Sequence, residues 1–171
     1  MANTRHIKAG SFVQQKLFAG VTVFAELESR IASLPEEKSR GDAFEVFAEA
    51  YLATQRKHDA AQVWPHGSVP LDTLKQLGLT ESDQGVDGVL KTLLGEFDAY
   101  QVKFRTNRPA LTWRELSTFI GLADSPRIHS RVLLTSKPRN SISTSTAIDT
   151  SRIIRSGRTL CSPQTALPSL A

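Results

Sequence analysis

The sequence predicts an α/β domain in which a helix, three strands, a second helix and a last strand follow one another, with a mixed central sheet flanked by helices. Three observations lead to this fold class. Apolar residues recur at intervals of three and four over residues 12–52, polar and apolar residues alternate over residues 97–105, and a helix start signal stands at Thr112. At 171 residues the chain can bury a core of ordinary size without a disulfide or metal staple.

The first part of the chain predicts two amphipathic helices. The apolar period runs from Phe12 to Leu34, where Pro35 ends it, so residues 1–37 are expected to form an N-terminal helical segment. A second helix is expected to begin near Asp42, because aspartate is a favourable N-cap. Its buried stripe comprises Phe44, Phe47, Ala48, Tyr51 and Leu52.

Two acids of this second helix differ in their expected exposure. At 100° per residue, Glu45 falls at the border of the buried stripe, so we expect it to be half-buried. Glu49 is expected to point further toward solvent. Glu45 is therefore the acid that the helix could contribute to a site on the sheet.

The middle of the chain predicts three strands. Residues 61–64 are expected to form a short strand, and residues 71–77 a short helix that Gly78 stops. Residues 85–93 and 97–105 are expected to form a hairpin with a turn near Gly95. Alternation along the second strand of this hairpin places Gln101 and Lys103 on one face of the sheet and the aromatic residues on the other.

The last helix and strand are predicted by local signals. Thr112 precedes Glu115 by three residues, which is the pattern of a capping box. Residues 131–135 are expected to form a short buried strand. Trp64 and Trp113 are expected to be packing residues and not base-stacking platforms. The buried face of the helix is expected to comprise Trp113, Leu116, Phe119 and Ile120.

The positive charge of the chain is concentrated near its end. The formal net charge is +4, and residues 136–171 carry five basic residues against Asp149 alone, whereas the preceding 135 residues hold 16 basic and 16 acidic side chains. Residues 137–171 are rich in Ser and Thr, so we expect a basic, disordered tail after a folded unit at 38–136. The tail could touch nucleic acid, but a solvated linker is the simpler interpretation, and a truncated or frame-shifted product stays open.

Composition excludes two broad classes of protein. Cys161 is the only cysteine, so an internal disulfide framework is excluded. No apolar run approaches the roughly 18 to 20 residues that a membrane-spanning helix needs, and the first residues lack the apolar core of a signal peptide. We therefore expect a cytoplasmic protein without a membrane partner.

Four polar residues could meet in one site. In an antiparallel hairpin, Asp87 can stand beside Gln101 and Lys103 of the next strand, and a helix packed on the sheet could add Glu45. Mg²⁺ prefers oxygen ligands and is usually held by one or two carboxylates together with phosphate oxygens. Asp87, Gln101 and Glu45 could supply such oxygens, and Lys103 could orient the attacking water and stabilise charge at phosphorus.

Each of these residues also has an ordinary interpretation. A Gln and Lys pair two residues apart is more often the solvated face of a strand than a catalytic site. Asp87 taken alone would be a turn residue, and Glu45 an acid of a helix surface. The coincidence of the four positions with the expected elements around them favours the functional interpretation.

The pattern resembles the Mrr-like restriction-endonuclease branch of the PD-(D/E)xK nuclease superfamily. The matching residues are Glu45 in FEVF, Asp87 in GVDGV, and Gln101 with Lys103 in YQVKFR. Together with LTWRELSTFIGL, these motifs look like the nuclease-like domain at the N-terminus of some large helicase proteins of bacteria and their mobile elements, over residues 38–136. The chain departs from the superfamily pattern at Val86, which stands in place of proline, and at Gln101, which carries no charge.

The resemblance implies a restriction-endonuclease-like fold and a metal-dependent DNA endonuclease. It implies Mg²⁺, with Mn²⁺ as a substitute, held by Asp87, Gln101 and Glu45, with Asp83 as a less favoured acid. DNA is the implied partner, a helicase protein or domain is a further one, and a homodimer stays open. The flanking arginines that could contact DNA phosphates are Arg40, Arg105, Arg108 and Arg114.

Two other functions stay open at this point. The chain could be a catalytically silent module that keeps the nuclease fold to bind DNA or a helicase partner. It could also be a fragment whose tail prevents stable function. The preferred DNA sequence, structure and methylation state, and the cut pattern, do not follow from the sequence.

Overall fold

The computed structural model describes residues 6–82, 85–106 and 111–136. Asp83, Arg108 and the predicted tail at 137–171 lie outside these residues. The described residues form a four-stranded sheet of order β1-β2-β3-β4, comprising β1 (Ala60–Pro65), β2 (Gly88–Thr92), β3 (Phe97–Lys103) and β4 (Ser130–Thr135). The predicted α/β fold class with a mixed sheet is confirmed, because β2 runs antiparallel to both β1 and β3, whereas β4 runs parallel to β3.

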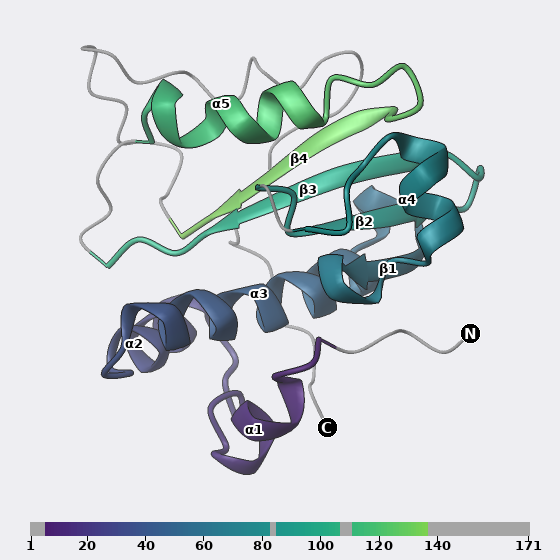
Figure 1. The fold of residues 1–171 in the computed structure, drawn as a ribbon. Coiled ribbons are helices and arrows are strands. Elements are labelled where there is room, and N and C mark those ends of the chain that lie inside the picture. The colour runs from purple at the N-terminus through teal and green to yellow at the C-terminus, as the bar shows by residue number, and fades with distance from the viewer. Residues whose placement is uncertain (1–5, 83–84, 107–110, 137–171) are drawn as a thin grey trace.

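Helices cover both faces of the sheet (Figure 1). Helix α3 (Glu37–Thr54) packs on one face, and helix α5 (Trp113–Leu122) lies on the other. Helix α4 (Leu71–Leu77) connects β1 to β2 and packs its Leu74 and Leu77 into the same core as Phe119 of α5. The 3-10 helices η1 (Arg56–His58) and η2 (His66–Ser68) flank β1.

Alternation along β3 sends its side chains into two separate cores. Tyr100 and Val102 join the core beneath α3, whereas Ala99 joins the core beneath α5. Gln101 and Lys103 share the face of Ala99, because side chains two apart on a strand point the same way. The predicted separation of Gln101 and Lys103 from the aromatic side chains is therefore confirmed.

The single N-terminal helix predicted from Phe12 to Leu34 is wrong. Two short helices, α1 (Ala9–Gln14) and α2 (Phe24–Ala32), replace it. The chain turns between them at Lys16 and Gly20, which have φ values of 56° and 67°. Both helices place apolar residues in the core beneath α3, so the apolar period continues across the break and hides it.

Helix α3 starts earlier than predicted, and it buries Glu49, an acid that was expected to be exposed. It begins at Glu37, so Asp42 lies inside the helix and forms an ion pair with Lys8 instead of capping it. The apolar stripe expected on this helix is buried, and Glu45 is half-buried as predicted. Glu49 was expected to face solvent, but it is only 7% exposed because the chain at His6 covers it.

The local predictions for the other helices hold, with one exception. Helix α4 ends at Gly78, whose φ is 74°, and helix α5 carries the predicted capping box. Trp64 is buried, but Trp113 is 54% exposed, so its predicted place on the buried face of α5 is wrong. None of the helices in the described part of the chain is long and apolar enough to cross a membrane.

Candidate active site at the end of strand β3

Asp87 is fixed against the end of β3 by three hydrogen bonds. It immediately precedes β2, and its backbone N–H donates to the carbonyl of Tyr100 at 2.9 Å while its own carbonyl accepts from the N–H of His66 at 2.9 Å. Its Oδ2 accepts the backbone N–H of Val102 at 2.5 Å. The carboxylate thus accepts a hydrogen bond from a β3 residue that lies beyond the last β2–β3 pair, which is Gly88 with Tyr100. The predicted approach of Asp87 to the strand that carries Gln101 and Lys103 is present.

Gly88 makes this close approach of the strands feasible. A Cβ atom at this position would lie 2.2 Å from the Tyr100 hydroxyl and 2.4 Å from the carbonyl oxygen of Trp64. The Tyr100 ring therefore crosses over Gly88, and its hydroxyl donates to the Trp64 carbonyl at 3.2 Å. Any larger residue after Asp87 would push β2 away from β3 and displace the carboxylate.

Gln101 presents a buried oxygen without a hydrogen-bond partner among the described residues. Its side chain is 2% exposed, and its Nε2 donates to the carbonyl of Gly85 at 2.8 Å. A carbonyl oxygen only accepts, so this bond fixes which end of the amide is nitrogen. The remaining atom, Oε1, is buried and has no partner. A buried acceptor left unpaired costs free energy unless something binds to it.

Lys103 is half-buried at the last position of β3. It lies on the same sheet face as Gln101, and within the described ranges its ammonium has no hydrogen bond or ion pair. The Asp87 carboxylate binds the peptide N–H of Val102, the residue between Gln101 and Lys103. The end of β3 thus holds the Asp87 carboxylate against the backbone between Gln101 and Lys103, two residues that share one face of the sheet.

Glu45 approaches this region from the opposite layer. It belongs to α3, and its Oε2 lies 3.1 Å from Nε2 of His6. Burial raises the pKa of the Tyr100 phenol well above its usual value, and the charges of Glu49, Asp87 and Glu45 raise it further. These three carboxylates therefore act on one buried hydroxyl, but α3 carries Glu45 on the side of the sheet opposite to the face of Gln101 and Lys103.

Sequence reasoning missed two groups that accompany Glu45. His6 is 10% exposed in its side chain, and its backbone N–H donates to Glu49 Oε2 while its ring contacts Glu45. Glu49 lies one helical turn after Glu45, so its spacing could have suggested a pair of acids. Nothing in the sequence around His6 indicates a contact with residues about forty positions away.

The arginines expected near DNA are engaged to different degrees. Arg40 donates to the carbonyl of Leu34 at 2.7 Å, so it closes the loop between α2 and α3. Arg105 forms an ion pair with Glu115. Burial would raise the pKa of Glu115, but hydrogen bonds from Thr112 and the charge of Arg105 outweigh this effect and lower it. Arg114 is exposed.

The donor atoms at the end of β3 fit a hard divalent cation in part. Asp87 offers a carboxylate, and the unpaired Oε1 of Gln101 offers a neutral oxygen of the kind that such ions accept. Among the described residues, no three histidine, cysteine, aspartate or glutamate side chains are grouped to hold a metal. A cation bound here would therefore need Gln101, water or phosphate oxygens to complete its coordination.

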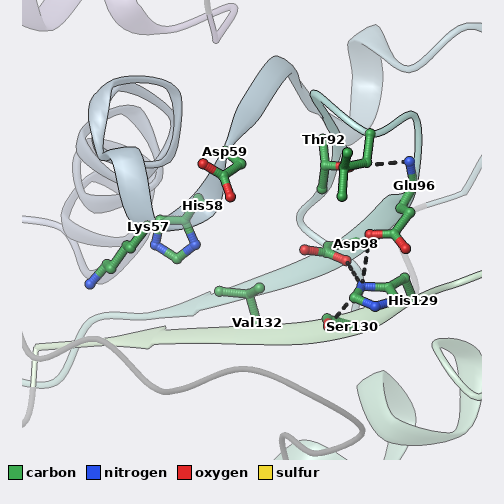
Figure 2. Close-up of a pocket in the computed structure, with 10 residues that line it drawn as sticks. Lys57, His58, Asp59, Thr92, Glu96, Asp98, His129, Ser130 and Val132 are labelled. Carbon is green, nitrogen blue, oxygen red and sulfur yellow. Dashed lines mark hydrogen bonds and ion pairs between the residues drawn. The ribbon is translucent and has the colours of Figure 1, made fainter.

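A cavity of about 150 Å³ opens at the other end of the sheet (Figure 2). His58 and Asp59 face Asp98 and His129 across it, and His129 Nδ1 lies 3.3 Å from Asp98 Oδ1. Burial, together with the charge of Lys57, lowers the pKa of His58 to about 4. Burial also raises the pKa of Asp98 against the opposing hydrogen bond from His129. This cavity contains none of the residues predicted for the active site.

Comparison with known proteins supports the sequence motif. Residues 52–156 match a family model described as a restriction endonuclease, of the Mrr type. The matched region contains Asp87, Gln101 and Lys103, begins seven residues after Glu45 and extends past Ser136. No curated protein and no solved structure shows significant similarity to the chain. The four-stranded mixed sheet flanked by helices is consistent with a restriction-endonuclease-like fold.

Proposed function

Because the chain belongs to the Mrr-like restriction endonuclease family of PD-(D/E)xK nucleases, we propose that it is a metal-dependent DNA endonuclease, acting in restriction, defence or DNA processing. The observation that supports this proposal best is the hydrogen bond from Val102 N–H to Asp87 Oδ2. It holds a carboxylate beside the strand that presents Gln101 and Lys103 on one face. A carboxylate and an amide oxygen suit a hard divalent ion, and an ammonium group suits the negative charge that develops during phosphodiester hydrolysis.

The proposed metal ligands are oxygen atoms of Asp87, Gln101 and Glu45. Mg²⁺ is the expected ion and Mn²⁺ a substitute, since both accept carboxylate and carbonyl oxygens. When bound, such an ion would neutralise charge on the phosphate and lower the pKa of a water molecule. The hydrogen bond from Gln101 Nε2 to the Gly85 carbonyl orients the amide and leaves Oε1 as the oxygen available to bind a metal ion. Glu45 would have to give up its contact with His6 or act through water.

Lys103 is proposed to act on the attacking water and on the transition state. In hydrolysis the water oxygen forms a bond to phosphorus, one ester P–O bond breaks, and the water loses a proton while the departing oxygen gains one. The Lys103 ammonium, which makes no ion pair within the described residues, can orient the water and balance the negative charge that develops on the phosphoryl oxygens. Its half-buried position strengthens this electrostatic effect.

DNA phosphates are proposed to lie along the exposed basic residues around the end of β3. Arg114 is exposed on the first turn of α5 and can contact phosphate without breaking another interaction. Arg105 would have to exchange Glu115 for phosphate, and Arg40 would have to release the carbonyl of Leu34. We therefore expect Arg114 to contribute more to DNA binding than either of them.

The decisive experiment measures nicking of supercoiled plasmid DNA by the purified full chain with Mg²⁺, with Mn²⁺ and with EDTA. We expect cleavage that needs a divalent ion and falls roughly 100-fold or more in Lys103→Ala, because one transition-state contact is typically worth a factor of about 10² to 10³. Lys91→Ala is the matched control, because Lys91 is an exposed lysine of β2 whose ammonium lies over the Phe97 ring. Equal nicking by the two variants, or none by the native chain, would refute the proposal.

A second candidate function is a catalytically silent module of the same fold that binds DNA or a helicase partner. The neutral Gln101 favours it, because the described centre at the end of β3 then holds a single carboxylate, that of Asp87, unless Glu45 contributes. This module would bind DNA equally with EDTA and with Mg²⁺, and would not cleave it under any divalent ion. Sedimentation of the full chain with and without DNA would also test the proposed homodimer.

A further inference from the structure

Trp113 is the exposed aromatic residue of the described chain. Its side chain is 54% exposed, whereas Trp64, the other tryptophan, is 7% exposed. The expected buried face of this helix included Trp113, but the helix turns Leu116 and Phe119 inward and leaves Trp113 outside. A tryptophan kept in solvent loses the burial energy that its large surface could provide, so its position needs another explanation.

The backbone of Trp113 is held near the end of β3. The first turn of α5 is fixed by the capping box and by the ion pair between Glu115 and Arg105, two residues beyond Lys103. Farther along the helix, the backbone N of Phe119 lies 3.6 Å from the Cβ position of Gly85, the residue whose carbonyl binds the Gln101 amide. Helix α5 therefore runs from the end of β3 to a point above the candidate active site.

The distance along α5 relates Trp113 to the scissile phosphate. Trp113 precedes Phe119 by six residues, which is about 9 Å at a rise of 1.5 Å per residue. The backbone of Trp113 is thus about 9 Å along the helix from the point at which α5 lies against Gly85, a separation that a DNA strand bound at the end of β3 can span.

On the basis of the proposed function, we propose that Trp113 stacks on an unpaired base of the strand that is cut. Stacking of a base on an aromatic side chain requires an unpaired or splayed nucleotide, since the faces of paired bases are covered by their neighbours. Arg114, the next residue, is exposed and can bind an adjacent phosphate. The preferred substrate of this site is therefore DNA with unpaired bases beside the cut.

The size of the exposed surface favours a base over a protein partner. A tryptophan buries at most about 150–250 Å², whereas a stable protein interface needs about 800 Å² from each partner. None of the other exposed large apolar residues of the described chain belongs to α5: Ile7, Val13 and Val23 lie in the N-terminal segment, Leu71 begins α4, and Leu93 and Leu94 lie in the β2–β3 turn. One rigid indole beside an arginine matches a base and its phosphate.

Tryptophan fluorescence of the full chain tests this proposal directly. The Lys103→Ala variant is titrated with a single-stranded oligothymidine of 16 nucleotides and with a blunt duplex of equal length. We expect the single strand to quench the Trp113 emission, which is the solvent-exposed component, while Trp64 stays unchanged. Trp113→Phe should retain affinity within a few-fold but lose the quenching. Trp113→Ala should weaken binding of the single strand roughly ten-fold or more.

The matched control is Leu94→Ala, which removes a side chain that is 77% exposed at the other end of the sheet and should not change binding. Absence of quenching by the single strand, or unchanged affinity of Trp113→Ala, would overturn the proposal. Equal quenching by the blunt duplex would overturn its requirement for unpaired bases. Plasmid nicking by the native chain is independent of this readout, so a failure of the nuclease proposal and a failure of the stacking proposal can be told apart.

Discussion

The two ends of strand β3 place polar residues in opposite situations. At its start, Asp98 contacts His129, which in turn contacts Glu96 and Ser130, around a cavity. At its end, Gln101 Oε1 and the Lys103 ammonium have no partner within the described residues, although the Gln101 amide is fixed through its Nε2 by the Gly85 carbonyl. Five residues, or about 17 Å of strand, separate these regions.

The difference between the two ends lies in which groups are paired. Around the cavity, Asp98, Glu96 and Ser130 all contact His129, and His58 Nε2 is the buried atom left without a hydrogen-bond partner among the described residues. At the far end of β3, a rigid backbone presents groups whose interactions are incomplete, which is what a substrate or metal requires. The family match covers both ends, so the distinction between them rests on contacts rather than on homology.

Replacement of Asp87 or Asp98 by asparagine is expected to give the largest difference in cleavage rate between the two ends of β3. Asp87→Asn removes the charge of the proposed metal ligand but keeps an oxygen that can accept the Val102 N–H, so the fold should survive. We expect plasmid cleavage to fall roughly 100-fold or more, because the amide is a weak ligand for a hard divalent ion.

Asp98→Asn is the control for this variant, since it also neutralises a β3-associated aspartate but acts at the cavity. It should change the cleavage rate by less than a few-fold. Circular dichroism at matched temperatures would verify that both variants are folded. A similar loss of cleavage in both variants, or a greater loss in Asp98→Asn, would contradict the assignment of the active site to the end of β3.

The cavity end should instead dominate the dependence of stability on pH. Burial and Lys57 lower the pKa of His58 to about 4 in the folded chain, whereas an exposed histidine has a pKa near 6.5. Between these values the unfolded chain binds a proton that the folded chain does not, so the free energy of unfolding falls as pH drops from about 6.5 to about 4. The loss is at most about 3 kcal/mol.

His58→Phe should remove this part of the pH dependence. Among the described residues, His58 Nε2 is buried without a hydrogen-bond partner, and the ring packs edge-on against Tyr51, so a phenyl ring can occupy the same place. Urea denaturation at pH 7, 6, 5 and 4.5 would measure the difference between the variant and the native chain. If the free energies of unfolding of the variant and the native chain change in parallel between pH 7 and 4.5, His58 is not the cause of the pH dependence. Cleavage near neutral pH should be unaffected in either case.

Local sequence patterns predicted the elements that build the site, because their determinants are local. Thr112 and Glu115 define the start of α5 through contacts three residues apart, and alternation defines the two faces of β3. The hairpin then has to return Gln101 toward Asp87. The arrangement of these residues could therefore be expected before any coordinates were known.

The errors of prediction arose where distant segments decide the outcome. Glu49 is buried because the chain at His6 covers it, and no helical period can indicate a contact 43 residues away. The break at Lys16 was hidden because both flanking helices are apolar toward the same core. Tryptophan is usually buried in proteins, so the exposure of Trp113 became clear only from its position in the structure.

The smallest expected effect concerns the neutral residue at the end of β3. Gln101→Glu adds the second acid that the site lacks, but it replaces the Nε2 donor with an oxygen that would face the Gly85 carbonyl at a distance of about 2.8 Å. We expect this replacement to lower the free energy of unfolding by about 1–2 kcal/mol in EDTA, because a hydrogen bond becomes a repulsion. Bound divalent ion should offset the new charge.

Millimolar Mg²⁺ should therefore stabilise Gln101→Glu more than it stabilises the native chain, as measured by urea denaturation with and without the ion. Gln62→Glu is the matched control, because Gln62 is a half-buried glutamine of β1 and should show no such gain. Equal responses of the two variants to Mg²⁺ would mean that the Gln101 oxygen does not face a bound cation. In that case the unpaired Oε1 would be a structural cost of the fold, and metal binding would have to rest on Asp87 and Glu45 without it.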